Sequence, residues 1–140
     1  MIGKTIAYED YNGNQRKETF FFHLSKAELM EMELVQDGGM EQMIQRIIDT
    51  QDRKRIVEIF KEIILKAYGE KSLDGKRFEK IRDGKRLADD FAQTEAYSIL
   101  FMELATDSGA AAAFINGAMP QGLAAEAAER SRQKGLEAVT

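Results

Sequence analysis

The sequence lacks cysteine and tryptophan, and it has one histidine, His23, and one proline, Pro120. Without cysteine the chain forms neither disulfides nor thiolate-based catalytic and zinc sites. A single histidine also excludes the multi-histidine metal sites of most metalloenzymes. No apolar run approaches the ~20 residues that span a bilayer, and the first residues do not have the pattern of a signal peptide. We therefore expect no catalytic residues, no metal, no cofactor and no membrane segment.

The composition is that of one globular domain, with 140 residues of which 44% are hydrophobic and 31% charged. Charge is distributed in blocks. Residues 53–86 have 12 basic and 6 acidic side chains. Residues 1–52 have 5 basic and 10 acidic side chains, and residues 87–120 have no basic and 5 acidic side chains. This acidic–basic–acidic pattern allows the folded chain to neutralise itself, or copies of it to form a homo-oligomer. The basic block could bind nucleic acid, but its interspersed acids favour a solvated face or a surface for acidic neighbours.

The first 24 residues predict a β-hairpin, because β-branched and aromatic residues flank the turn signal Asn12-Gly13-Asn14. A three-residue loop would place Ile6 opposite Phe20. That register puts Phe20 and Phe22 on the same face as Ile6 and leaves Phe21 on the opposite face.

Most of the remaining chain has helical periodicity. It begins with the capping box Ser25-Lys26-Ala27-Glu28. The expected helices run over residues 25–35, 40–49, 52–68, 85–92, 94–105 and 109–116. Residues 70–84 contain two Asp-Gly pairs, which predict a loop with about one helical turn. Residues 94–105 are apolar on nearly every side, which places that helix at the centre of the fold.

These patterns predict an α+β fold. An N-terminal β-hairpin, residues 1–24, is followed by a mostly α-helical bundle of about five or six helices in residues 25–120. Residues 121–140 are rich in Ala, Glu and Arg and have few groups to bury. We expect them to form a C-terminal helical or mobile tail beside a domain that spans residues 1–120.

Two stretches stand out as sequence motifs. The first combines YEDYNGN at residues 8–14 with FFFHL and SKAEL at residues 20–29 and GGM at residues 38–40. The second is AFINGAMP at residues 113–120. In this order and spacing they resemble the opening and the close of phage tail assembly chaperones, and the resemblance covers residues 4–120.

The resemblance implies a protein of long-tailed, siphovirus-type bacteriophages that is not an enzyme. Such a chaperone binds the tape measure protein and keeps it soluble until tail tube subunits polymerise around it, so the tail tube protein is a further candidate partner. The resemblance also implies action in the host cytoplasm during infection and absence from the mature virion.

Candidate client-binding residues are Phe21, on the second face of the hairpin, and Met32 and Met43. Methionine is flexible and polarizable, which suits an adaptable client surface; the alternative is that these methionines fill the core between two helices. Two other functions stay open. One is a structural tail protein that remains in the virion and pairs through the hairpin edge. The other is a small nucleic-acid-binding regulator that uses residues 53–86.

Overall fold

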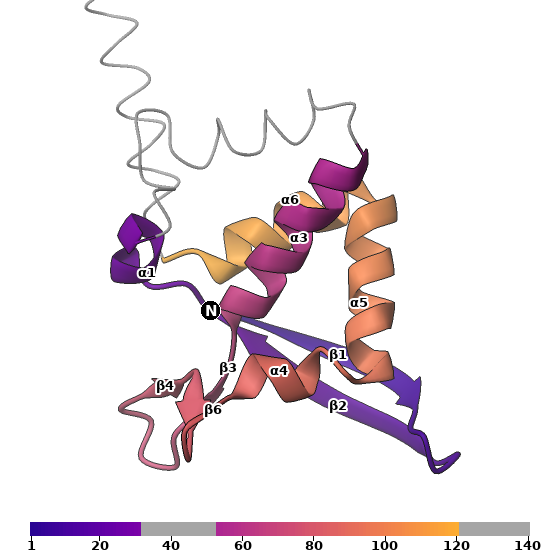
Figure 1. Cartoon of the computed structure of the whole chain (residues 1–140), viewed down its shortest axis with the longest axis horizontal. Helices are drawn as coiled ribbons and strands as arrows, with labels where there is room; N and C mark the ends of the chain where they lie inside the picture. Colours follow the sequence, from indigo (N-terminus) through magenta and orange to yellow (C-terminus); the bar gives the residue numbers. More distant parts are fainter. Residues whose placement is uncertain (32–52, 121–140) are drawn as a thin grey trace, which may run out of the picture.

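The computed structural model describes residues 1–31 and 53–120 (Figure 1). In chain order the described elements are β1 (Ile2–Glu9), β2 (Gln15–Phe22), α1 (Lys26–Glu31), α3 (Arg53–Ala67), β3 (Tyr68–Lys71), β4 (Phe78–Glu79), β5 (Ile81–Arg82), β6 (Lys85–Arg86), α4 (Leu87–Phe91), α5 (Glu95–Thr106) and α6 (Ser108–Ala118). The fold is mixed α+β with N-terminal strands, as predicted. The helix expected over residues 40–49 and the C-terminal tail lie outside the described residues.

The first two strands form the predicted hairpin. Phe20 and Phe22 share a face with Ile6, as the alternation of the sequence predicts. The predicted register is wrong by two residues, because Ile6 lies opposite Glu18 and not opposite Phe20. A shift of two residues leaves every side chain on its predicted face, so the buried side of the hairpin is still the expected one.

The register differs because the turn takes five residues, 10–14, and not three. The Asp10 carboxylate accepts hydrogen bonds from the backbone N–H groups of Asn12 and Asn14, each at 2.9 Å. Gly13 has a φ of 82°, in the region that glycine adopts without strain. The side chain of Asp10 therefore organises a wider turn than the Asn-Gly signal alone predicts.

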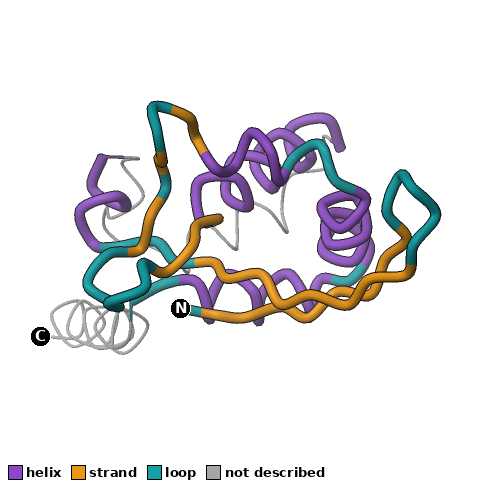
Figure 2. The backbone as a smooth tube through the Cα atoms, turned by 90° about the horizontal axis from the view of Figure 1, so that it is seen from below, coloured by secondary structure: helices purple, strands orange, loops and turns teal. Residues whose placement is uncertain are grey.

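Four strands form one sheet in the order β1-β2-β3-β4, and β5 and β6 form a separate two-stranded ribbon. Helices pack on one face of the sheet: α5 and α6 contact β1, and α4 contacts β3 (Figure 1). Figure 2 shows the two long strands running side by side along one edge of the molecule to the hairpin tip. On the opposite face Gly3, Thr5 and Ala7 are exposed, so the described helices leave this part of β1 uncovered.

Aromatic rings gather where the helices meet the sheet. Phe22 is fully buried and packs edge to face on Phe91 and Phe114, with ring centroids 5.7 and 5.0 Å apart. Tyr68 stacks on Phe91 at 4.3 Å, and burial raises the pKa of Tyr68 to about 12. Such ring pairs contribute about 0.5–1.5 kcal/mol each beyond the area they bury. The core therefore joins β2, β3, α4 and α6.

The segment after α3 differs from the prediction. The helix ends at Ala67, and Tyr68 begins β3. The expected loop over residues 70–84 contains strands, and the expected helix over residues 85–92 is divided between β6 and α4. These strands are two to four residues long, too short to give a period-two pattern in the sequence. Strand β3 pairs with the distant β2, whereas β4 pairs with β3, and β6 with β5, across short connections.

The apolar composition of residues 94–105 predicted a helix that is enclosed on all sides. This prediction is wrong, because α5 has an exposed side. Its buried side consists of Ala96, Leu100 and Leu104. Ile99 and Met102 lie on its outer sides and are 43% and 55% exposed. Because α5 packs on one face of the sheet, at its edge strand, its far side meets solvent.

Helix starts follow the sequence signals closely. The capping box forms as predicted: the Ser25 N–H donates to Glu28 Oε1 at 3.0 Å, and the Glu28 N–H donates to Ser25 Oγ at 3.1 Å. The Asp107 carboxylate accepts from the Ala110 N–H at 3.1 Å and caps α6. This last helix extends to Ala118, two residues beyond its predicted end.

Gly69 in β3 lies very close to residues of the neighbouring strand β4. A Cβ atom on Gly69 would lie 2.6 Å from Phe78 Cε2 and 2.7 Å from the Glu79 carbonyl oxygen. A backbone oxygen in a strand cannot move away without breaking the pairing. We therefore expect Gly69→Ala to lower the free energy of unfolding by about 2 kcal/mol, measured by urea denaturation.

Gly3 offers a matched control in the neighbouring part of the sheet. Its Cβ position is 3.1 Å from the nearest atom, a ring carbon of Phe21, and that side chain can shift. Gly3→Ala should therefore cost less than about 1 kcal/mol. If both variants lose the same stability, crowding at Gly69 is not the reason.

Candidate interaction surface

The second face of the sheet is called the outer sheet face below; it comprises Gly3, Thr5, Thr19, Phe21, Lys71 and Phe78. Phe21 lies opposite Gly3 on one side and Gly69 on the other. The missing side chain of Gly3 leaves room for the Phe21 ring, and that of Gly69 leaves room for the Phe78 ring. The Lys71 ammonium lies 4.6 Å from the ring centroid, a cation–π distance. The face thus presents a half-buried aromatic ring beside a cation.

Of the three predicted client-binding residues, Phe21 is the one in the described part of the chain. It lies on the face opposite Phe22, as predicted. Met32 and Met43 lie outside the described residues. The structure therefore does not bring the three together.

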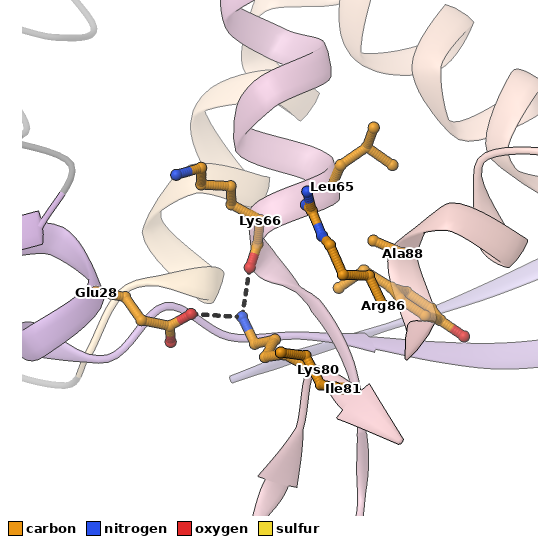
Figure 3. Close-up of a pocket in the computed structure, with 8 residues that line it drawn as sticks. Glu28, Leu65, Lys66, Lys80, Ile81, Arg86 and Ala88 are labelled. Atoms are coloured by element: carbon orange, nitrogen blue, oxygen red, sulfur yellow. Dashed lines mark hydrogen bonds and ion pairs between the residues drawn. The ribbon is translucent and has the colours of Figure 1, made fainter. Parts of the chain in front are cut away.

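A small open pocket lies between α1, the end of α3 and the β5–β6 ribbon (Figure 3). Its volume is about 200 Å³, below the about 300 Å³ at which small-molecule sites begin. It combines cationic and apolar side chains and is called the basic pocket below. Its lining residues are Glu28, Leu65, Lys66, Tyr68, Lys80, Ile81, Arg86 and Ala88. A pocket of this size suits one amino-acid side chain better than a cofactor.

Lys80 joins three elements at one wall of the basic pocket. Its ammonium donates to Glu28 Oε2 at 3.0 Å, to the His23 carbonyl at 2.8 Å and to the Lys66 carbonyl at the end of α3 (Figure 3). Burial lowers the pKa of Lys80. Burial also raises the pKa of Glu28, but hydrogen bonds from the Ser25 backbone and Lys80 outweigh it and leave that pKa below its ordinary value. Lys80 therefore acts as a cap on the C-terminus of α3.

The two other cations of the basic pocket are not neutralised. Neither Lys66 nor Arg86 forms an ion pair within the described ranges, whereas Arg82 pairs with both Glu79 and Glu70. In Figure 3 the Arg86 side chain rises toward α3 beside Leu65. Arg86 is the N-cap residue of α4, but its side chain makes no capping hydrogen bond. Its guanidinium thus remains available for a carboxylate.

The β5–β6 ribbon forms the lip of the basic pocket. A two-residue turn closes it, and both turn residues, Asp83 and Gly84, have positive φ values of 53° and 76°. This is the type I′ pattern, whose twist matches that of paired strands. Ile81 lies directly opposite Arg86 in the ribbon and is 63% exposed. An apolar side chain and an unpaired cation therefore stand side by side at the lip.

His23 lies at the end of β2, close to both surfaces. Its ring meets Phe78 edge-on with centroids 6.0 Å apart. Its Nδ1 atom is buried and has no hydrogen-bond partner among the described residues. Burial, the N-terminal amino group and Lys80 lower the pKa of His23, and Glu28 opposes them more weakly. The imidazole is therefore neutral near pH 7.

Within residues 1–31 and 53–120, no group of three or more His, Asp or Glu side chains could hold a metal ion. No single helix in these ranges is long and apolar enough to cross a membrane. Helices α5 and α6 together have the length and composition, but they are bent by 115° at their junction.

Sequence reasoning missed the basic pocket. Most cationic side chains of residues 53–86 in the described part of the chain are exposed, as expected, but Lys80 is half-buried and lines the basic pocket together with Lys66 and Arg86. The Asp83-Gly84 turn is the signal that could have found it, because a two-residue turn there places Ile81 beside Arg86.

Residues 1–139 match the family of phage tail assembly chaperones. The chain therefore belongs to this family, a class of assembly proteins and not of enzymes, whose partners are phage tail proteins. No curated protein and no solved structure matches the chain. The family match confirms the resemblance carried by the two motif stretches and extends it beyond residue 120.

Proposed function

We propose that this chain binds the tape measure protein of its phage and keeps it soluble during tail tube assembly. A tape measure protein is expected to be a very long, mostly helical chain, whose apolar stripes would aggregate before the tube encloses them. The observation that carries the proposal is the outer sheet face. Phe21 stands there beside exposed strand residues, on a side of the sheet where the described helices do not pack.

In this proposal the client contacts Phe21, Met32 and Met43. The tail tube protein is a further partner, and copies of the chaperone associate through their charge blocks. The chaperone acts in the host cytoplasm during infection by a siphovirus-type phage and leaves before the virion is complete. Residues 1–120 form the chaperone domain, and residues 121–140 form its tail.

The test is co-expression with the tape measure protein of the same phage. The full chain should raise the soluble fraction of the client and co-purify with it. Phe21→Ala should reduce co-purification several-fold, because it removes an aromatic contact. Tyr11→Ala is the matched control, since Tyr11 is a 75% exposed aromatic residue at the tip of the same hairpin. A client that stays insoluble beside the wild-type chain would contradict the proposal.

A structural role in the virion is the second candidate. Its support is that β1 is an edge strand of the described sheet. However, Lys4 points inward from this strand and pairs with Glu103 at 3.2 Å. An inward charge on an edge strand opposes pairing with a further strand. Mass spectrometry of purified virions separates the two roles, because abundant peptides of this chain would indicate the structural one.

A further inference from the structure

We propose that the basic pocket is the docking site for an acidic segment of the tape measure protein. One apolar side chain of that segment enters the pocket, and neighbouring carboxylates bind Arg86 and Lys66. This inference rests on the proposed function, which supplies the client. It adds a second contact site for the client, apart from Phe21, Met32 and Met43, and the chemistry that recognises the client there.

The shape of the basic pocket fits a single apolar anchor. Leu65, Tyr68 and Ala88 provide apolar lining, and Ile81 extends it at the lip. The volume of about 200 Å³ accommodates a side chain. An entering Leu, Ile, Met or Phe side chain would also cover Ile81, which is 63% exposed. Burial of a large apolar side chain favours binding and offsets part of the cost of association.

The charge around the basic pocket selects an acidic partner. Arg86 and Lys66 form no ion pair in the described part of the chain. Three acids around the pocket already have cationic partners: Glu28 pairs with Lys80, and Glu70 and Glu79 pair with Arg82. An incoming carboxylate therefore meets unpaired cations, whereas a basic segment would be repelled.

The site is also preorganised. The tight turn fixes the β5–β6 ribbon, and the Leu87 N–H donates to the Lys80 carbonyl at 2.9 Å, which anchors the ribbon to α4. Lys80 in turn holds α1 and the end of α3 in place. Little ordering is needed when a segment binds, and this lowers the entropic cost of association.

A protein segment fits the basic pocket better than nucleic acid does. The aromatic ring of its lining belongs to Tyr68, and this ring is already stacked on Phe91 at 4.3 Å. It is therefore not a platform on which a base could stack.

The experiment uses the full chain and overlapping, fluorescently labelled peptides of about 25 residues from the tape measure protein. Binding is measured by fluorescence anisotropy. We expect the bound peptides to combine large apolar residues with Asp or Glu. Arg86→Glu should weaken their binding at least about tenfold, because it reverses the charge at the lip. Ile81→Ser should weaken it about fivefold through lost apolar contact.

Lys76→Glu is the matched control for the pocket variants. It makes the same change of charge in the same basic block, but Lys76 is exposed and does not line the pocket. We expect its affinity to stay within about threefold of wild type. Circular dichroism confirms that each variant is folded, which Arg86→Glu should be because Arg86 is exposed and its side chain does not cap α4.

Each other outcome is decisive. Equal binding by Arg86→Glu and Lys76→Glu would overturn the pocket proposal and leave the chaperone function standing. Failure of the wild-type chain to bind any peptide or to solubilise the full-length client would overturn both. Preference for basic peptides, or retention of duplex DNA that Arg86→Glu abolishes while peptide binding is unchanged, would overturn the proposed acidic partner.

Discussion

Phe22→Ala is expected to lower the free energy of unfolding by about 3–5 kcal/mol, the usual cost of removing a buried ring. Phe22 is fully buried, and its ring lies within 5.0–5.8 Å of three other rings, those of Tyr68, Phe91 and Phe114. The substitution opens a cavity where the sheet meets α4 and α6. Domains of this size have total stabilities of about 5–15 kcal/mol, so the loss is a large share.

Urea denaturation followed by far-ultraviolet circular dichroism measures this loss, since the chain has no tryptophan to report by fluorescence. Phe21→Ala is the control at the adjacent position. Phe21 is half-buried on the outer sheet face and contacts Lys71, so its removal should cost about 1 kcal/mol. Similar losses for the two variants would contradict the faces assigned to the hairpin.

Lys80→Met is expected to lower the free energy of unfolding by about 3 kcal/mol. The substitution removes the donor to Glu28 and to the His23 and Lys66 carbonyls. Hydrogen bonds to charged groups contribute about 1.5–3 kcal/mol each. Water in the open pocket replaces part of them, because the Lys80 side chain is 25% exposed.

A double-mutant cycle with Glu28→Gln isolates the ion pair from the two carbonyl contacts. The pH dependence gives a second check. The folded-state pKa of Glu28 is lowered, so its carboxylate stabilises the fold above the unfolded-state pKa of about 4.3 and loses this effect as the pH falls through the folded-state pKa. The difference between wild type and Lys80→Met should therefore shrink in acid. If the stability difference between wild type and Lys80→Met grew in acid instead, Lys80 would stabilise the fold without its ion pair to Glu28.

Local rules predicted those parts of the fold that short stretches of sequence determine. Alternation placed Phe20 and Phe22 on the buried face, and the capping box that begins at Ser25 marks where α1 begins. The hairpin register could not be derived in this way. The Asp10 side chain widens the turn, and a sequence pattern does not show which of several turns a carboxylate will stabilise.

Short strands and the limits of the sheet account for the other differences. The strands from Tyr68 to Arg86 are too short to leave a periodic signal; β3 pairs with the distant β2, and the others pair across short connections. The apolar composition of α5 predicted burial on all sides, but a helix at the edge of a sheet keeps Ile99 and Met102 exposed. Composition indicates how much apolar surface exists and not where neighbouring elements end.

Of the two candidate surfaces, the sequence predicted one residue of the outer sheet face but not the basic pocket. Alternation alone placed Phe21 on the outer sheet face. The basic pocket is assembled from α1, α3 and the β5–β6 ribbon, and Glu28 and Lys80, which meet in it, are 52 residues apart in the sequence. Only the folded chain brings such residues together, so a single sequence could not reveal their arrangement.

The N-terminal hairpin and α6 lie at opposite ends of the described chain and contact each other. Ile2 lies against Gly117, where a Cβ atom would approach within 2.6 Å, and the Leu24 N–H donates to the Ala118 carbonyl at 2.8 Å. A ribosome makes the hairpin first and α6 much later. The nascent polypeptide therefore cannot close its core until α6 has been synthesised, so a product that terminates before α6 would leave the hairpin without this packing partner and open to proteolysis.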